Sequence, residues 1–122
     1  MHFVPDDVDG FLERIAAIAD DADLIITSGG VSAGAYEVVK DALASRGVDF
    51  VKVAMQPGKP QGFGVAERTL LFGLPGNPVS AMVSFEVFLR PVLRAAMDLP
   101  QPQRSIRTAT LTQDCRSPLG KR

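Results

Sequence analysis

The spacing of hydrophobic residues changes several times along the chain and predicts alternating helices and strands. From Val8 to Ala19 the apolar residues recur at helical spacing, after Asp6 and Asp7, which can cap a helix. We expect this helix to end near Asp21. Residues 24–27 form a continuous apolar run rich in β-branched side chains, which predicts a buried strand.

The middle of the chain repeats this alternation. A second helix is predicted over residues 36–45, with Gly47 as its left-handed cap. Residues 50–55 and 69–72 are predicted strands, and residues 57–64 between them are predicted to be a loop.

A third helix is predicted to begin at Asn77, which can cap it, with Pro78 in its first turn. Pro91 should kink this helix or start a new one. The order of elements predicts an α/β fold, a three-layer α/β/α domain with a mostly parallel sheet.

The character of the chain changes after Leu99. Residues 100–105 are polar and contain two prolines, which is typical of a linker, and the alternation in residues 106–112 predicts a strand. We therefore divide the chain into an α/β domain over residues 1–99 and a linker with one predicted strand over residues 100–122.

Composition excludes several classes of function. The 122 residues carry 13 basic and 14 acidic side chains, a formal charge of −1, so no overall positive field favours nucleic acid or an anionic membrane. No apolar run reaches the length of a membrane span. Cys115 is the only cysteine, which excludes an internal disulfide and fits a reducing cytoplasm. Any anion must be bound by a local site.

Three unusual segments each follow a predicted strand. They are Thr27–Gly34, Pro57–Pro60 and Gly73–Ser80. Because ligands of parallel sheets bind at the carboxyl ends of the strands, we expect these segments to form one binding site.

The first segment combines glycines with the hydroxyls of Thr27, Ser28 and Ser32. Glycine allows backbone N–H groups to approach phosphate oxygens, and the hydroxyls can donate hydrogen bonds to them or help to hold a hydrated metal ion. A plain tight turn explains the glycines equally well. The spacing is neither the dinucleotide fingerprint nor a P-loop.

Two charged residues allow a functional or a structural interpretation. Glu37, in the first turn of the second helix, more simply offsets the helix dipole, although it could bind a metal or transfer a proton. Lys59 lies between Gly58 and Pro60; most loop lysines have no specific role, but one held by two prolines is a good anion ligand.

The third segment is a helix start that can bind an anion. A well-capped helix explains Asn77 and Pro78 completely. It leaves Ser80, expected on an exposed first turn, without a structural reason.

Together, the sequences Asp23–Ser32, Pro57-Gly58-Lys59-Pro60 and Gly73–Ser80 resemble the molybdopterin molybdotransferases, the MoeA group with the E domain of gephyrin. The resemblance covers residues from about 4 to 120, and the last two motifs are specific in combination. It implies a MoaB/MogA-like domain and an enzyme that inserts molybdenum from molybdate into adenylylated molybdopterin (molybdopterin-AMP), releases AMP and uses Mg²⁺.

The resemblance also assigns residues. It implies that Glu37 and Lys59 are catalytic, that Glu37 is the Mg²⁺ ligand, and that Lys59, Pro60 and Ser80 lie at the molybdate pocket. The residues expected to bind the pterin, AMP or molybdate are Thr27, Ser28, Gly29, Gly30, Ser32, Gly34, Pro60, Gly76, Asn77 and Ser80.

The sequence departs from the family in two side chains and in length. Glu37 replaces an aspartate, and Gln56 stands where many relatives have a lysine. Family members are about three times longer, so the resemblance implies that the chain is a C-terminal-side fragment whose parent is a cytoplasmic homodimer. It also implies that residues 1–99 lack the first strand and helix of the α/β domain, and that residues 100–122 are a linker and the first strand of a truncated C-terminal β domain. Two alternatives stay open for the fragment: a non-catalytic module that binds molybdopterin or AMP, and an interaction module.

Overall fold

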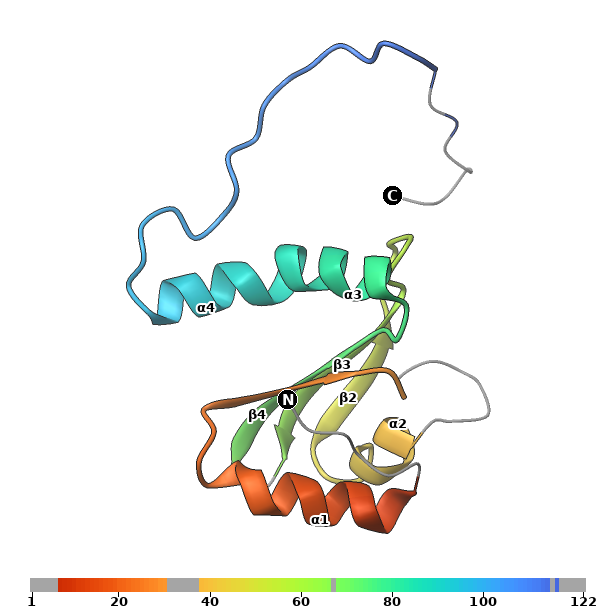
Figure 1. Ribbon diagram of the computed structural model, residues 1–122, viewed down its shortest axis with the longest axis vertical. Coiled ribbons are helices and arrows are strands. Elements are labelled where there is room, and N and C mark those ends of the chain that lie inside the picture. Colours follow the sequence, from red (N-terminus) through yellow and green to blue (C-terminus); the bar gives the residue numbers. More distant parts are fainter. Residues whose placement is uncertain (1–6, 31–37, 67, 115, 117–122) are drawn as a thin grey trace.

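The computed structural model describes residues 7–30, 38–66, 68–114 and 116 of the chain. They form four strands and several helices, in an order that begins with a helix and ends with a long, nearly continuous helical rod (Figure 1). The elements are α1 (Val8–Ala19), β1 (Leu24–Ser28), α2 (Val38–Leu43), β2 (Val48–Lys52), β3 (Pro60–Ala66), β4 (Thr69–Leu74), α3 (Pro78–Ser84), the π-helix η1 (Phe85–Leu89) and α4 (Arg90–Ala96).

The α/β class is confirmed, but the sheet is mixed and not mostly parallel. Its strand order is β1-β4-β3-β2, with β1 and β4 parallel and the other two pairs antiparallel. The difference comes from β3, most of which the sequence analysis assigned to a loop. Only residues 67 and 68 separate β3 from β4, and a connection that short allows an antiparallel hairpin but no parallel crossover.

The helices cover both faces of the sheet, which gives the predicted three layers. In Figure 1, α1 and α2 lie on one face, and the α3–η1–α4 rod lies on the other. The hydrophobic core is on the α1–α2 face, where Leu71 of β4 and Leu43 of α2 are almost fully buried. The other core residues are Phe11, Ile15, Ala19, Ile25, Val39, Ala42, Val48 and Ala66.

The opposite face of the sheet is covered less completely. Ile26, Phe63, Val65 and Leu70 all point to this face, and each is 43–54% exposed. The Phe63 and Phe72 rings contact each other there, with centroids 5.7 Å apart. Most of the free energy of apolar burial therefore comes from the α1–α2 side.

The helix start predicted at Asp7 is confirmed, whereas α2 ends at Leu43, four residues before Gly47, which was predicted to cap it. The Asp7 carboxylate caps α1 and accepts a hydrogen bond from the Gly10 amide at 2.7 Å, and Gly47 adopts the left-handed conformation with φ 88°. Pro91 lies at the start of α4, directly after η1. Because proline has no N–H for the regular helical bond, the wider π-turn before it continues the rod without a break.

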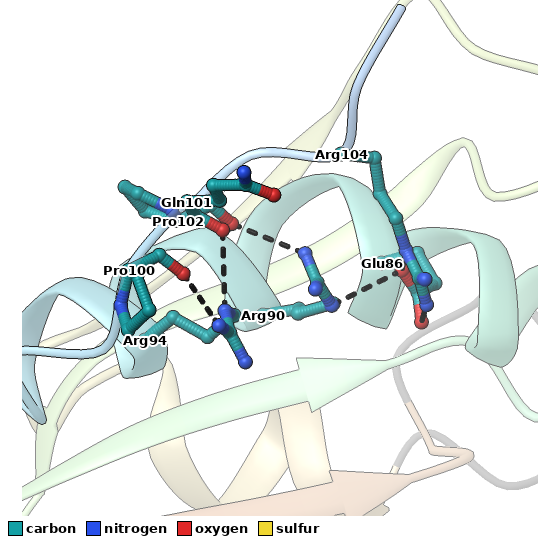
Figure 2. Close-up of polar contacts among 7 residues, drawn as sticks. All are labelled: Glu86, Arg90, Arg94, Pro100, Gln101, Pro102 and Arg104. Carbon is teal, nitrogen blue, oxygen red and sulfur yellow. Dashed lines mark hydrogen bonds and ion pairs between the residues drawn. The ribbon is translucent and has the colours of Figure 1, made fainter.

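The segment after α4 runs back along the rod. Figure 2 shows the Arg90 and Arg94 side chains donating to backbone carbonyls of residues 100–102, and Arg104 forming a bidentate contact with Glu86 at 2.8 and 2.9 Å. The linker is therefore held by side chains of η1 and α4.

The strand predicted over residues 106–112 is not formed. These residues have no regular secondary structure, and Ile106 is 99% exposed. A strand needs a neighbour for its hydrogen-bond ladder, and no described residue pairs with this segment. The proposed division at residue 99 stays a prediction.

Candidate functional site

The described part of the first unusual segment, residues 27–30, lies beside the third segment at the carboxyl ends of β1 and β4. In the parallel register Thr27 is opposite Gly73 and Ser28 is opposite Leu74, and the Gly29 amide donates to the Leu74 carbonyl at 3.0 Å. A β-carbon added to Gly76 would lie only 3.2 Å from the Gly29 Cα. Glycine at position 76 therefore allows the two loops to approach closely through their backbones.

Two hydroxyls of the first segment lie beside this contact. Ser28 donates to the Pro75 carbonyl over a long 3.4 Å. The Thr27 hydroxyl oxygen is buried and has no hydrogen-bond partner among the residues that the structure describes. A buried hydroxyl without a partner is unfavourable by about 1–3 kcal/mol, so Thr27 has hydrogen-bonding capacity that a ligand could use.

The second segment joins the same edge because β2 and β4 run in the same direction. It connects the end of β2 to the start of β3, and its base is closed by a 2.8 Å hydrogen bond from the Val53 amide to the Lys59 carbonyl. A β-carbon on Gly58 would lie 2.9 Å from the Ser84 hydroxyl and 3.6 Å from the Ser80 carbonyl. The loop therefore packs directly against α3.

This packing presents Lys59 outward. Gly58 is buried, Pro60 is half-buried as the first residue of β3, and Lys59 between them is exposed. No ion pair among the described residues involves Lys59. A cation on a loop whose backbone is fixed on both sides can bind an anion with little loss of backbone entropy.

The start of α3 differs from expectation at Ser80. Asn77 caps the helix as predicted and accepts a hydrogen bond from the Ser80 amide at 3.0 Å. Ser80 is buried and not exposed, with its hydroxyl donating to the same Asn77 oxygen at 3.3 Å. The cap therefore explains Ser80 structurally, and that amide is not free for an anion.

Three predicted site residues, Ser32, Gly34 and Glu37, lie outside the described residues, whereas Gly30 is described and has φ 68°. The described part of the chain contains no group of three or more histidine, cysteine, aspartate or glutamate side chains that could hold a metal ion. The described residues therefore do not by themselves make a Mg²⁺ site, and the assignment of Glu37 to Mg²⁺ stays a prediction.

Two buried polar residues at this edge have no recognisable signal in the sequence. Gln61 is 3% exposed and Ser84 is fully buried, and they are joined by a 2.6 Å hydrogen bond between the Gln61 amide nitrogen and the Ser84 hydroxyl. Gln61 was assigned to a loop, where a polar side chain needs no explanation. Only its position in β3 facing α3 makes it unusual.

A shallow pocket of about 250 Å³ lies elsewhere, between α1, α2 and the end of β3. Its lining residues are mostly apolar but include Glu13 and Arg46, and none of them belongs to the three segments. The chemistry-bearing residues are at the opposite end of the sheet, so we do not regard this pocket as the site.

The chain is an α/β domain with glycine-rich loops and the exposed Lys59 at one edge of its sheet. This arrangement is suited to binding phosphate or another oxyanion. Residues 1–95 match the family described as "Probable molybdopterin binding domain". The chain belongs to this family.

Individual relatives agree with the family. The chain is 62% identical over 124 residues to "Molybdopterin molybdenumtransferase 2" of Mycobacterium tuberculosis, a match that covers 96% of this chain and 31% of the relative. It is 45% identical to "Molybdopterin molybdenumtransferase" of Haemophilus influenzae, over 74% of this chain and 22% of the relative. The chain spans less than a third of the length of these curated relatives.

A solved structure has the same fold. The crystal structure of a molybdopterin biosynthesis MoeA protein from Pyrococcus horikosii superposes with a TM-score of 0.66 and 29% identity, over 78% of this chain and 23% of that one. These findings support a role in molybdenum cofactor biosynthesis. Among the described residues, no helix is long and apolar enough to cross a membrane.

Proposed function

We propose that this chain carries the substrate-binding edge of a molybdopterin molybdotransferase, which inserts molybdenum from molybdate into adenylylated molybdopterin and releases AMP. One observation carries the proposal: three segments separated in the sequence lie together at one edge of the sheet, through the Gly29–Gly76 approach and the packing of Gly58 against Ser80. The names of the relatives supply molybdopterin and molybdenum. The adenylylated form of the pterin, molybdate and the release of AMP are what the resemblance of the sequence motifs implies.

In this proposal the two halves of the edge bind different parts of the substrates. The backbone of Gly29 and Gly76 receives the phosphate side of the adenylylated pterin, together with the Thr27 hydroxyl, which has no partner among the described residues. Lys59 binds molybdate, because a tetrahedral dianion is best held by a positive charge that needs little ordering. Mg²⁺ at Glu37 would neutralise part of the phosphate charge. We also propose that the full-length protein is a homodimer in the cytoplasm.

The role of Lys59 can be tested by its removal. A charge-assisted hydrogen bond contributes about 1.5–3 kcal/mol, so Lys59→Ala should weaken molybdate binding on the order of ten-fold to a hundred-fold. Molybdate is titrated into the full chain by calorimetry, with adenylylated molybdopterin present, and AMP release is followed separately.

The matched control is Arg107→Ala, which removes an exposed positive charge from the segment after α4. Its titration should be the same as that of the unsubstituted chain. An unaltered molybdate titration in Lys59→Ala would refute the role of Lys59, and equal weakening in both variants would show only a general effect of charge.

A further inference from the structure

We infer that Gln61 is the positioning residue that ties the Lys59 loop to α3 and so sets where the Lys59 ammonium meets its anion. This inference rests on the proposed function for the identity of the anion. The connection of the Lys59 loop to α3 depends only on hydrogen bonds and packing within the chain.

Gln61 makes two short hydrogen bonds with one nitrogen. Its amide nitrogen donates to the Gly58 carbonyl at 2.6 Å and to the Ser84 hydroxyl at 2.6 Å. Gly58 is the residue before Lys59, and Ser84 ends α3. One side chain therefore connects the loop that carries the lysine to the helix whose first turn belongs to the same site.

The connection is buried, which makes it specific. Gln61 is 3% exposed, Ser84 is fully buried, and neither group can exchange its partner for bulk water. Removing the amide would leave the Gly58 carbonyl and the Ser84 hydroxyl without this bond in a dry environment. The native position of the loop is thus favoured over displaced positions.

Close packing gives the loop little room to compensate. Gly58 has φ 104°, and even a β-carbon at this position would lie 2.9 Å from the Ser84 hydroxyl. The Val53–Lys59 hydrogen bond fixes the other side of the loop. Gln61 is therefore the described side chain that links the loop to α3 by a hydrogen bond, and α3 in turn follows the Gly76–Asn77 turn.

The test compares Gln61→Met with a matched control. Methionine has a similar length and is apolar, so it fills the space and removes both hydrogen bonds. The control is Thr69→Val, which removes another buried hydrogen bond, from the Thr69 hydroxyl to the Ala19 carbonyl at 2.7 Å, at the opposite end of β4. Ser84→Ala serves as a second variant, because it removes one of the two bonds and keeps the Gln61–Gly58 bond.

The first readout needs no ligand. Amide hydrogen exchange of Val53, whose N–H is bonded to Lys59, reports opening of the loop in the full chain. We expect at least a roughly ten-fold faster exchange of this amide in Gln61→Met, a smaller increase in Ser84→Ala, and no selective change in Thr69→Val. An unchanged Val53 amide in a folded Gln61→Met chain would overturn the inference.

The second readout is the affinity for molybdate compared with the affinity for adenylylated molybdopterin. We expect Gln61→Met to weaken molybdate binding at least several-fold while the pterin affinity stays within about two-fold, and Thr69→Val to change neither. A loosened loop with unchanged molybdate affinity would overturn the positioning role. If the unsubstituted chain binds no molybdate, the proposed function fails, and the exchange of Val53 alone decides whether Gln61 ties the loop.

Discussion

Leu71→Ala tests whether the chain is held together on the α1–α2 face of the sheet. Leu71 is fully buried in β4, between its parallel neighbour Ile25 on β1 and its antiparallel neighbour Gly64 on β3. Truncation of a buried leucine costs about 2–5 kcal/mol, depending on how well the neighbours fill the cavity. Gly64 has no side chain to move into it, so we expect a loss of about 3–4 kcal/mol.

Leu70→Ala is the matched control because the two leucines are adjacent in β4 and point to opposite faces. Leu70 is 45% exposed, so its truncation removes about half of the apolar burial and should cost about 1 kcal/mol. Urea unfolding followed by far-UV circular dichroism gives both free energies of unfolding, provided that the slopes agree. Equal losses in the two variants would refute the assignment of the core to the α1–α2 face.

Two further predictions concern the left-handed glycines and the contact between Glu86 and Arg104. Gly58→Ala and Gly47→Ala both place a side chain at positive φ, at 104° and 88°, and each should lower the free energy of unfolding, measured by thermal unfolding, by at least about 1–2 kcal/mol. Only Gly58→Ala should also weaken molybdate binding. Equal weakening by Gly47→Ala would contradict the location of the site. The pKa of Glu86 is lowered from its ordinary value, chiefly because Arg104 donates a hydrogen bond to its carboxylate. The contact between Glu86 and Arg104 is therefore fully present above the ordinary pKa of a glutamate and is lost as the pH falls through the lower pKa of Glu86 in the folded chain. The NMR signals of the Arg104 side chain should titrate together with Glu86, and they should not change with pH in Glu86→Gln. An Arg104 signal that does not respond to acid in the unsubstituted chain would contradict the contact.

The elements whose signals are local can be predicted from the amino-acid sequence alone. The cap at Asp7, the left-handed Gly47 and the capped helix start at Asn77 depend on neighbouring residues only, and the structure has all three. The three unusual segments could be found for the same reason, since glycine, proline and lysine in a loop are visible without any knowledge of distant contacts. The α/β class followed from the alternation of these local signals.

Contacts between distant parts of the chain determine which strands are neighbours and which partners the buried polar groups have. Residues 60–66 become the strand β3 because they pair with β2 and β4, whereas residues 106–112, with a more regular strand pattern, stay irregular because no described residue pairs with them. Strand formation depends on a partner, and the partner can lie anywhere in the sequence.

The dependence on distant partners also explains which residues of the candidate site could be predicted and which could not. Lys59 was recognisable from its own loop, but the interaction of Gln61 with Ser84 joins residues 23 positions apart. Ser80, expected to be exposed, is buried because its helix packs beside the Lys59 loop. The local sequence shows which groups could bind an anion, and long-range packing determines where those groups lie.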